Sequence, residues 1–251
     1  MGSFFEESKP VNAYDVDINN KLKLNTLFSF LQDVASSHAD SLSLGYNDLI
    51  AKDLGWVLSW AKLQVEEYPS FGEIIKIRTW PKCRYKLYSM REFLIYNEND
   101  KLLYSVSTAW LLINVKTKRI TDIKNLPQQI YYQPDFQALN DFPERIIIDK
   151  EKETLFSKRI RYTDLDINRH VNNTKYIELI LDSYPPDYHK NNLLDSLTVS
   201  FIAESFYDDE MDIRIAPKGF KDKYDVIDGV NKKTSKQVFQ ALVGWRIPEL
   251  K

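Results

Sequence analysis

The sequence of 251 residues has little cysteine, glycine and histidine. Cys83 is the only cysteine, which excludes an intrachain disulfide and a metal cluster held by several thiolates. The three histidines, His38, His170 and His189, lie far apart in the sequence, so we expect no zinc site, and we expect no cofactor either. No stretch approaches the roughly 18 consecutive apolar residues of a membrane-spanning helix.

The chain also lacks an excess of charge of one sign, with a formal net charge of −2. Such a balance gives no general attraction to nucleic acid or to an anionic membrane, so we expect neither as a partner. The opening segment MGSFFEESKP is acidic and does not have the basic and then apolar layout of a signal peptide. We therefore expect a cytoplasmic protein, whose 43% of apolar residues suffice for one large or two smaller domains.

Polar residues are concentrated in the stretch TDLDINRHVNNTKYIELILD, which covers residues 163–182. Asp164, Asp166, Asn168 and His170 all precede a segment with the apolar spacing of a helix. Aspartate and asparagine at the start of a helix usually cap its free N–H groups, and we assign Asp164 to such a turn or cap. A cap needs only one or two such residues, so the remainder indicate a chemical role.

A weaker copy of the motif occurs in the first half of the chain. The segment DVDINNK at 15–21 matches DLDINRH at 164–170, which sets Asp17 against Asp166 and Lys21 against His170. An amphipathic helix is expected after each copy, from about Leu24 to Leu42 and around residues 176–184. Two matched motifs, each followed by the same kind of helix, predict an internal duplication.

After each expected helix the apolar residues change to a period of two, which predicts strands. The stretches concerned are 57–81, 86–96 and 101–115 in the first half and 197–217, 224–230 and 236–246 in the second. Setting Glu73 against Glu210 places Glu67 opposite Glu204. One helix against a strongly curved antiparallel sheet in each half is an α+β arrangement. We expect a first domain at 1–127, a connector at 128–150 and a second domain at 151–251.

The residues that match between the halves also resemble a known family. The run from Asp164 to Tyr176, the segment WVLSWAKLQVEEYPSFGE at 56–73 and FIAES at 201–205 resemble the acyl-acyl-carrier-protein thioesterases of plants and bacteria. The resemblance implies two tandem hotdog domains packed as a pseudo-dimer, in which the N-terminal domain holds the acyl chain. It further implies hydrolysis of fatty acyl-acyl-carrier protein, with that carrier protein as partner, and it leaves a homodimer possible.

The same resemblance implies that Asp166, Asn168, His170 and Glu204 are the catalytic residues. Asp166 or Glu204 can activate water, or a carboxylate can attack the thioester directly and form an anhydride. Asn168 can position the water or the carbonyl, and His170 can donate a proton. The start of the helix after Asn172 offers backbone N–H groups to the oxyanion.

Two departures from the family pattern limit the mechanism. Plant members have a cysteine directly after the glutamate, where this chain has Ser205, so a cysteine–histidine–asparagine mechanism is excluded at that position. Ser205 has no evident base of its own, and we do not expect it to be a nucleophile. The first half has Lys21 in place of His170, so we expect only the second half to be catalytic.

Several alternatives remain open at this point. The chain can be a hotdog hydrolase that acts on acyl-coenzyme A, a hydratase of that fold, or a double hotdog that binds acyl chains without catalysis. An acidic carrier protein requires a local basic surface, for which Lys82, Arg84, Lys86 and the segment 116–119 are candidates. In the first helix, small residues around Ala35 indicate either an acyl pocket or close approach of the sheet. His38, on the apolar face of the same helix, is expected to be a core histidine whose ring nitrogens have hydrogen-bond partners.

Overall fold

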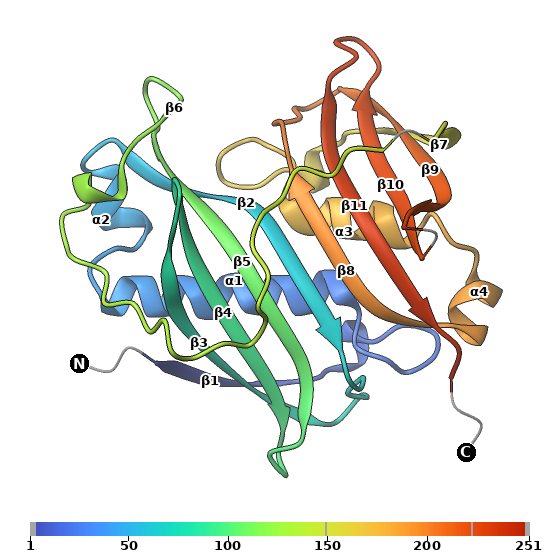
Figure 1. The fold of residues 1–251 in the computed structure, drawn as a ribbon, viewed down its shortest axis with the longest axis horizontal. Coiled ribbons are helices and arrows are strands. Elements are labelled where there is room, and N and C mark those ends of the chain that lie inside the picture. Colours follow the sequence, from blue (N-terminus) through green and yellow to red (C-terminus); the bar gives the residue numbers. More distant parts are fainter. Residues whose placement is uncertain (1–3, 149, 222, 249–251) are drawn as a thin grey trace. The chain divides into compact units, whose positions relative to one another are not determined.

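The computed structural model describes residues 4–148, 150–221 and 223–248. The chain forms two compact units, Met1–Pro143 and Glu144–Lys251, which we call the first and second units (Figure 1). Within the described residues, no helix is long and apolar enough to cross a membrane.

The first unit is one antiparallel sheet crossed by a long helix. Its strands follow the order β1-β3-β4-β5-β2, with the short β6 added beside β5. The elements are β1 (Phe5–Pro10), α1 (Leu24–Ser41), α2 (Tyr46–Ile50), β2 (Leu54–Val65), β3 (Ile74–Tyr85), β4 (Tyr88–Asn97), β5 (Leu102–Asn114) and β6 (Arg119–Ile120). Short 3-10 turns cover Ala13–Asp15 and Ile123–Asn125.

The second unit repeats this plan with a shorter helix. Its strands follow the order β7-β9-β10-β11-β8. This is the strand order of the first unit, with β7 in the place of β1, β8 in that of β2, and so on to β11 in that of β5. The elements are β7 (Glu153–Arg159), α3 (Asn173–Leu181), α4 (Pro186–Asn191), β8 (Leu193–Phe201), β9 (Glu210–Phe220), β10 (Tyr224–Asn231) and β11 (Gln237–Arg246). The predicted α+β duplication is confirmed by this repeated topology.

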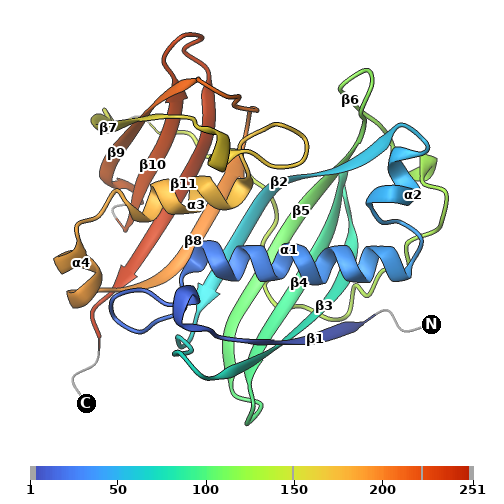
Figure 2. The same cartoon turned by 180° about the vertical axis from the view of Figure 1, so that it is seen from behind.

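The helix α1 lies across the strands of the first unit because one of its faces is apolar (Figure 2). Its buried residues keep the predicted helical spacing: Leu24, Leu27, Phe28, Leu31, Val34, Ala35 and His38. Opposite them, Ile75 and Ile77 of β3 and Ile95 of β4 are fully buried. Of the small residues in the middle of α1, Ala35 is buried whereas Ser36 is exposed.

The second helix is shorter than the sequence indicated. Asn172 caps α3, and the helix ends at Leu181, before the expected end at Tyr184. Pro186 does not simply stop a helix but opens α4, because proline fits the first turn of a helix where no N–H partner is needed. The expected start of this helix after Asn172 is confirmed, and only its end is displaced.

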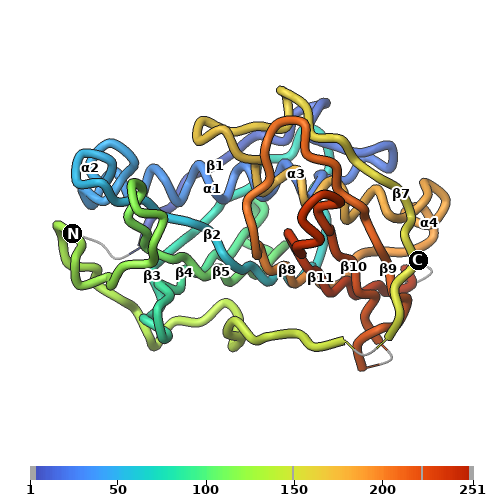
Figure 3. The backbone as a smooth tube through the Cα atoms, turned by 90° about the horizontal axis from the view of Figure 1, so that it is seen from above, coloured from blue at the N-terminus to red at the C-terminus, as the bar shows by residue number. Residues whose placement is uncertain are grey.

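The segment that follows β6 packs on the first unit rather than hanging free between domains. It runs along the face of the sheet opposite to α1 (Figure 3). Trp80 donates its indole N–H to the carbonyl of Phe136 at 3.2 Å, and the rings of Phe142 and Tyr85 lie 4.6 Å apart. The first unit therefore extends to Pro143, beyond the 1–127 that the sequence suggested.

A buried ion pair holds this segment in place. Lys82 and Glu92, which are 3% and 0% exposed, make a contact of 2.9 Å. Glu92 also accepts from the backbone N–H groups of Ala138 and Leu139, and Lys82 donates to the Leu139 carbonyl at 2.7 Å. Lys82 is thus not a surface residue, and its place in the proposed docking patch was wrong.

The last part of the predicted connector belongs to the second unit. Ile146 and Ile148 pack against a buried cluster on the second sheet, formed by Ala216, Val226 and Leu242. The segment places apolar side chains on sheet faces without being a strand or a helix, which explains the absence of a clear hydrophobic period there.

Candidate active site

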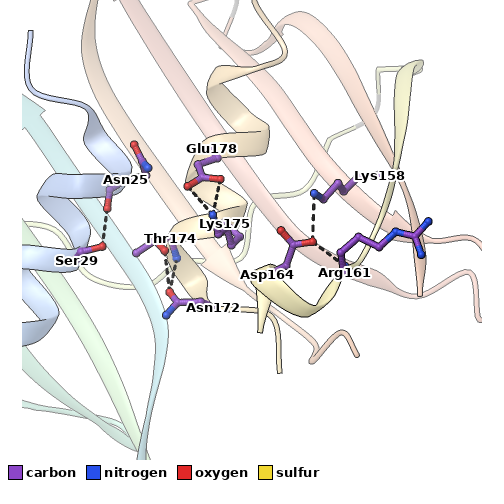
Figure 4. A network of polar contacts seen from close by, with 9 residues as sticks. All are labelled: Asn25, Ser29, Lys158, Arg161, Asp164, Asn172, Thr174, Lys175 and Glu178. Atoms are coloured by element: carbon purple, nitrogen blue, oxygen red, sulfur yellow. Dashed lines mark hydrogen bonds and ion pairs between the residues drawn. The ribbon is translucent and has the colours of Figure 1, made fainter. Parts of the chain in front are cut away.

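The polar motif of the second half forms a turn that leads directly into α3. It begins with a 3-10 turn at Tyr162–Asp164 and closes through an isolated bridge between Leu165 and Val171. Asp164 is buried, and its carboxylate accepts from the Arg161 backbone N–H at 2.8 Å and pairs with Lys158 at 3.2 Å (Figure 4). The expected structural role of Asp164 is therefore confirmed.

Asp166 fixes the shape of this turn. Its Oδ1 accepts from the backbone N–H groups of Asn168 at 2.8 Å and His170 at 3.2 Å. Its own N–H donates to the His170 carbonyl at 2.8 Å, and Arg169 takes a positive φ of 64° to complete the reversal. Oδ1 is thus committed to the backbone, which leaves Oδ2 of Asp166 as the oxygen available for chemistry.

His170 and Glu204 come together from segments that are separate in the sequence. Nδ1 of His170 lies 3.4 Å from Oε1 of Glu204, and the side chains are 19% and 46% exposed. The two segments are joined by a hydrogen bond of 3.0 Å from the Val171 N–H to the Ser205 carbonyl, and Phe206 meets the imidazole edge-on at 5.2 Å. A carboxylate at Nδ1 orients the ring and leaves Nε2 to exchange a proton with a substrate.

The side chain of Asn168 is not held in the site by contacts with its neighbours. The residue is exposed, and only its backbone N–H contacts Asp166. Its side-chain amide makes no hydrogen bond with the part of the chain that the structure describes. The structure therefore brings Asp166, His170 and Glu204 to one place, with Asn168 at the tip of the same turn.

The start of α3 offers one uncommitted backbone donor. The side chain of Asn172 accepts from the Thr174 N–H at 2.9 Å, and its carbonyl accepts from the Lys175 N–H at 2.9 Å (Figure 4). The N–H of Asn173, in the first turn, has no acceptor among the described residues. This N–H and the positive end of the helix dipole suit a developing oxyanion.

Tyr176 is a site residue that the sequence reasoning treated only as part of the apolar face of the helix. Its side chain is 2% exposed, and burial raises the pKa of its phenol to about 12. The carboxylates of Asp166, Asp209 and Glu204 act in the same direction, while the Ser205 hydroxyl opposes them. Tyr176 thus remains a neutral phenol close enough to Asp166 and Glu204 for their charges to act on it. Its place one turn into α3, after Asn172, is a signal that could have identified it from the sequence.

The first unit repeats the turn but not the chemistry. Oδ1 of Asp17 accepts from the N–H groups of Asn19 at 2.8 Å and Lys21 at 3.0 Å, as Asp166 does in the second unit. The predicted match of Asp17 with Asp166 and of Lys21 with His170 is therefore confirmed. A turn of this shape needs only the aspartate, so the first unit has the same turn although it lacks the histidine.

The predicted match of Glu67 with Glu204 was wrong by one residue. Val11 donates to the Glu73 carbonyl at 2.8 Å, and the equivalent bond in the second unit joins Ile160 to Asp209 at 2.8 Å. Glu73 therefore corresponds to Asp209 and not to Glu210. Backbone pairing decides this register, whereas aligning one glutamate with another by identity alone does not.

With the register corrected, Tyr68 is the counterpart of Glu204. The ammonium of Lys21 lies 5.6 Å from the centre of the Tyr68 ring, so a cation–aromatic contact replaces the imidazole–carboxylate pair. Glu67 instead forms an ion pair with Lys101. The first unit therefore lacks both the histidine and the glutamate of the site.

Neither Ser205 nor Cys83 is placed as a nucleophile. Ser205 is completely buried, and its backbone carbonyl serves the turn. Cys83 belongs to β3 of the first unit, where burial raises the pKa of its thiol and so disfavours the reactive thiolate. Both findings agree with the mechanism expected from the sequence.

Two family models match the chain along both units. The model of the acyl-ACP thioesterase N-terminal domain matches residues 2–131. The model of the acyl-ACP thioesterase C-terminal domain matches residues 148–246. The chain belongs to the acyl-ACP thioesterase family.

Curated relatives of this acyl-ACP thioesterase family member come from plants. An acyl-[acyl-carrier-protein] hydrolase of Cuphea viscosissima is 26% identical over 219 residues, which are 81% of this chain and 52% of the relative. An oleoyl-acyl carrier protein thioesterase of Coriandrum sativum is 24% identical over 235 residues, which are 86% of this chain and 63% of the relative. The chain thus spans between half and two thirds of the length of these relatives.

Solved structures show the same double hotdog fold. An acyl-ACP thioesterase from Bacteroides thetaiotaomicron superposes with a TM-score of 0.88 at 24% identity, covering 97% of this chain and 98% of the other. A 12:0-ACP thioesterase from Umbellularia californica gives a TM-score of 0.82 at 19% identity, covering 99% of both chains. The α+β fold of two tandem hotdog domains is confirmed for this member of the family.

Proposed function

We propose that this chain hydrolyses the thioester of fatty acyl-acyl-carrier protein and releases the free fatty acid, which ends chain elongation. The contact of 3.4 Å between His170 and Glu204, beside the free Oδ2 of Asp166, carries this proposal. The family membership and the printed names of the plant relatives support the same substrate.

The reaction needs a nucleophilic oxygen, a place for the oxyanion and a proton for the leaving thiolate. Oδ2 of Asp166 either takes a proton from the attacking water or attacks the carbonyl itself to form an anhydride that water then opens. The carbonyl oxygen gains the electron pair and is stabilised at the Asn173 N–H. As the C–S bond breaks, Nε2 of His170 gives its proton to the thiolate, while Glu204 stabilises the imidazolium through Nδ1.

The remaining residues support these steps. The phenol of Tyr176 stays neutral and so adds no further negative charge near the carboxylates of Asp166 and Glu204. Asn168, at the exposed tip of the turn, orients the water or the thioester when substrate is bound. We further propose an acidic carrier protein as partner and a cytoplasmic location, while a homodimer stays a prediction.

Thiol release from a panel of substrates tests the proposal. Acyl-acyl-carrier proteins and acyl-coenzyme A thioesters of matched chain length are incubated with the protein, and free thiol is measured over time. We expect turnover of the carrier-protein substrates and its loss in Asp166→Asn. Release from acyl-coenzyme A alone would favour the coenzyme A hydrolase, and binding of acyl chains without any release would favour the non-catalytic module.

A further inference from the structure

Polar side chains from three elements meet inside the first unit, away from the proposed catalytic residues. Arg91 of β4 donates from Nη1 to Nδ1 of His38 on α1 at 3.0 Å. The same nitrogen donates to Oγ1 of Thr79 on β3 at 3.1 Å. The Thr79 hydroxyl donates a hydrogen bond to the Glu92 carbonyl at 2.9 Å, and its oxygen accepts the one from Arg91. We call His38, Thr79 and Arg91 the donor cluster.

The hydrogen bond from Arg91 fixes the proton on His38. A guanidinium has only donors, so Nδ1 of His38 must be the acceptor and Nε2 must carry the proton. Burial, with a smaller effect of the nearby Arg91 charge, lowers the pKa of His38 to about 4, so the ring stays neutral. Nε2 is buried and has no acceptor among the described residues, although the ring is only 1% exposed. His38 is therefore buried as expected, but only half satisfied.

The charge of Arg91 is also uncompensated. Among the described residues, no carboxylate forms an ion pair with it, and the neighbouring Glu92 is committed to Lys82 and the segment around Leu139. Burial lowers the pKa of Arg91 to about 10, so the guanidinium keeps its charge at neutral pH. Arg91 as a whole residue is half-buried rather than fully buried.

Buried donors without acceptors are unfavourable unless something supplies the missing oxygen. The cluster presents the Nε2–H of His38 and the unused N–H groups of Arg91, and the Thr79 oxygen already accepts from Arg91. Phe5 stacks on the His38 ring with centroids 5.4 Å apart, which makes the surroundings of the imidazole apolar. Such a site selects an oxygen acceptor that is carried on an otherwise apolar molecule.

We propose that the donor cluster binds an oxygen atom on the acyl chain, so that the enzyme favours acyl groups with a hydroxyl or oxo substituent. Ala35 precedes His38 by about one turn on the buried face of α1, so the two side chains lie on the same face of the helix. The inference rests on the proposed function for the acyl chain as the source of the oxygen. The proposed catalytic residues belong to the second unit, so the donor cluster is not part of the proposed catalytic machinery.

Matched substrates test this proposal in the wild-type protein. Acyl carrier protein is loaded with a saturated chain and with chains of the same length that bear a hydroxyl or oxo group at successive positions. Thiol release gives kcat/KM for each. We expect one or more oxygenated chains to exceed the saturated chain about tenfold, the scale of a hydrogen bond to a charged group. Equal or lower values for every oxygenated chain would overturn the proposal and leave an ordered water as the occupant.

A pair of variants assigns the preference to the cluster. Arg91→Met removes the donors, and we expect it to abolish the preference for oxygenated chains while the saturated chain is still hydrolysed. Arg78→Met is the matched control, because Arg78 is exposed on β3 and paired with Glu6 at 2.9 Å. The control should keep the preference. A preference that survived in folded Arg91→Met would contradict the assignment.

Direct binding separates this inference from the proposed function. Free saturated and hydroxylated fatty acids of equal length are titrated into wild-type protein, and heat of binding gives each Kd. We expect about tenfold tighter binding of the hydroxylated acid. That result without any thiol release would disprove the proposed hydrolysis and keep the cluster as a ligand site. Thiol release with equal Kd values and equal kcat/KM would disprove the cluster alone.

Discussion

The ammonium of Lys21 lies 5.6 Å from the centre of the Tyr68 ring, at the positions that His170 and Glu204 occupy in the second unit. One duplicated turn thus supports two different pairs of side chains. The turn depends on an aspartate that binds two backbone N–H groups, and this requirement is met by Asp17 and Asp166 alike. The side chains that face the turn are free to diverge because they do not hold it together.

Substitutions in the second unit should therefore abolish activity where those in the first do not. We expect Asp166→Asn, His170→Ala and Glu204→Ala each to lower kcat by about two orders of magnitude or more, the usual scale of acid–base groups. Asparagine keeps an oxygen for the turn and removes only the charge. Lys21→Ala, the matched control, should leave kcat close to that of the wild type. A folded Asp166→Asn protein with normal turnover would contradict the site.

Ser205 should be dispensable for the chemistry. Its side chain is fully buried, so substrate cannot reach the hydroxyl without a rearrangement. We expect Ser205→Ala to retain thiol release within a few-fold of the wild type, and mass spectrometry of a rapidly quenched reaction to show no acyl group on Ser205. A stable acyl-enzyme at this residue would require a different mechanism.

The surface that receives the carrier protein should include the basic residues near the start of β4. Arg84 is partly exposed and pairs with Asp122 at 2.9 Å, and Lys86 lies over the Tyr85 ring at 4.9 Å. We expect Arg84→Glu with Lys86→Glu to raise KM for acyl-acyl-carrier protein much more than KM for acyl-coenzyme A. Lys236→Glu, an exposed lysine of the second unit, is the control. Equal effects on both substrates would exclude this surface.

We expect the acyl chain to lie along α1 near Ala35, which is 7% exposed, so that the side chain at this position limits the length of the chain. Each buried methylene contributes about 0.8 kcal/mol. Two carbons are then worth about 1.6 kcal/mol, or roughly tenfold in specificity. Ala35→Phe should shift the preferred chain toward shorter lengths and spare turnover of the shortest substrates. An unchanged chain-length profile in a folded variant would show that Ala35 does not line the pocket.

The neutral state of His38 predicts a loss of stability in acid. Its pKa falls from the usual 6.5 to about 4 in the folded protein, so the unfolded chain binds the extra proton first. The stabilisation is complete above pH 6.5 and is lost as the pH falls toward 4, by up to about 3 kcal/mol. His38→Gln cannot titrate, yet its amide oxygen can still accept from Arg91. The free energy of unfolding, measured with denaturant, should therefore decline less steeply from pH 7 to pH 4.5 for His38→Gln than for the wild type. Parallel curves for the two proteins would refute the neutral state assigned to His38.

The sequence by itself determined the local elements and most of the proposed site. The spacing of Leu24, Leu27 and Leu31 is enough to predict the buried face of α1, because helical periodicity is a local property. The aspartates of both turns were visible for the same reason, since each binds N–H groups within four residues of itself. The choice of His170 and Glu204 as site residues came instead chiefly from the family resemblance, and their contact is seen only in the structure.

Only the tertiary structure decided what depends on pairing between distant segments. Backbone hydrogen bonds set Tyr68, not Glu67, at the place of Glu204, because the match of two glutamates by residue type does not fix the register between distant segments. The sequence predicts Lys82 to be a surface charge, but in the structure it is buried and paired with Glu92 of the next strand. Arg91 and His38 lie 53 positions apart, and their shared lack of an acceptor exists only once α1 packs on the sheet. Long-range packing creates such relationships, and no local pattern in the chain records them.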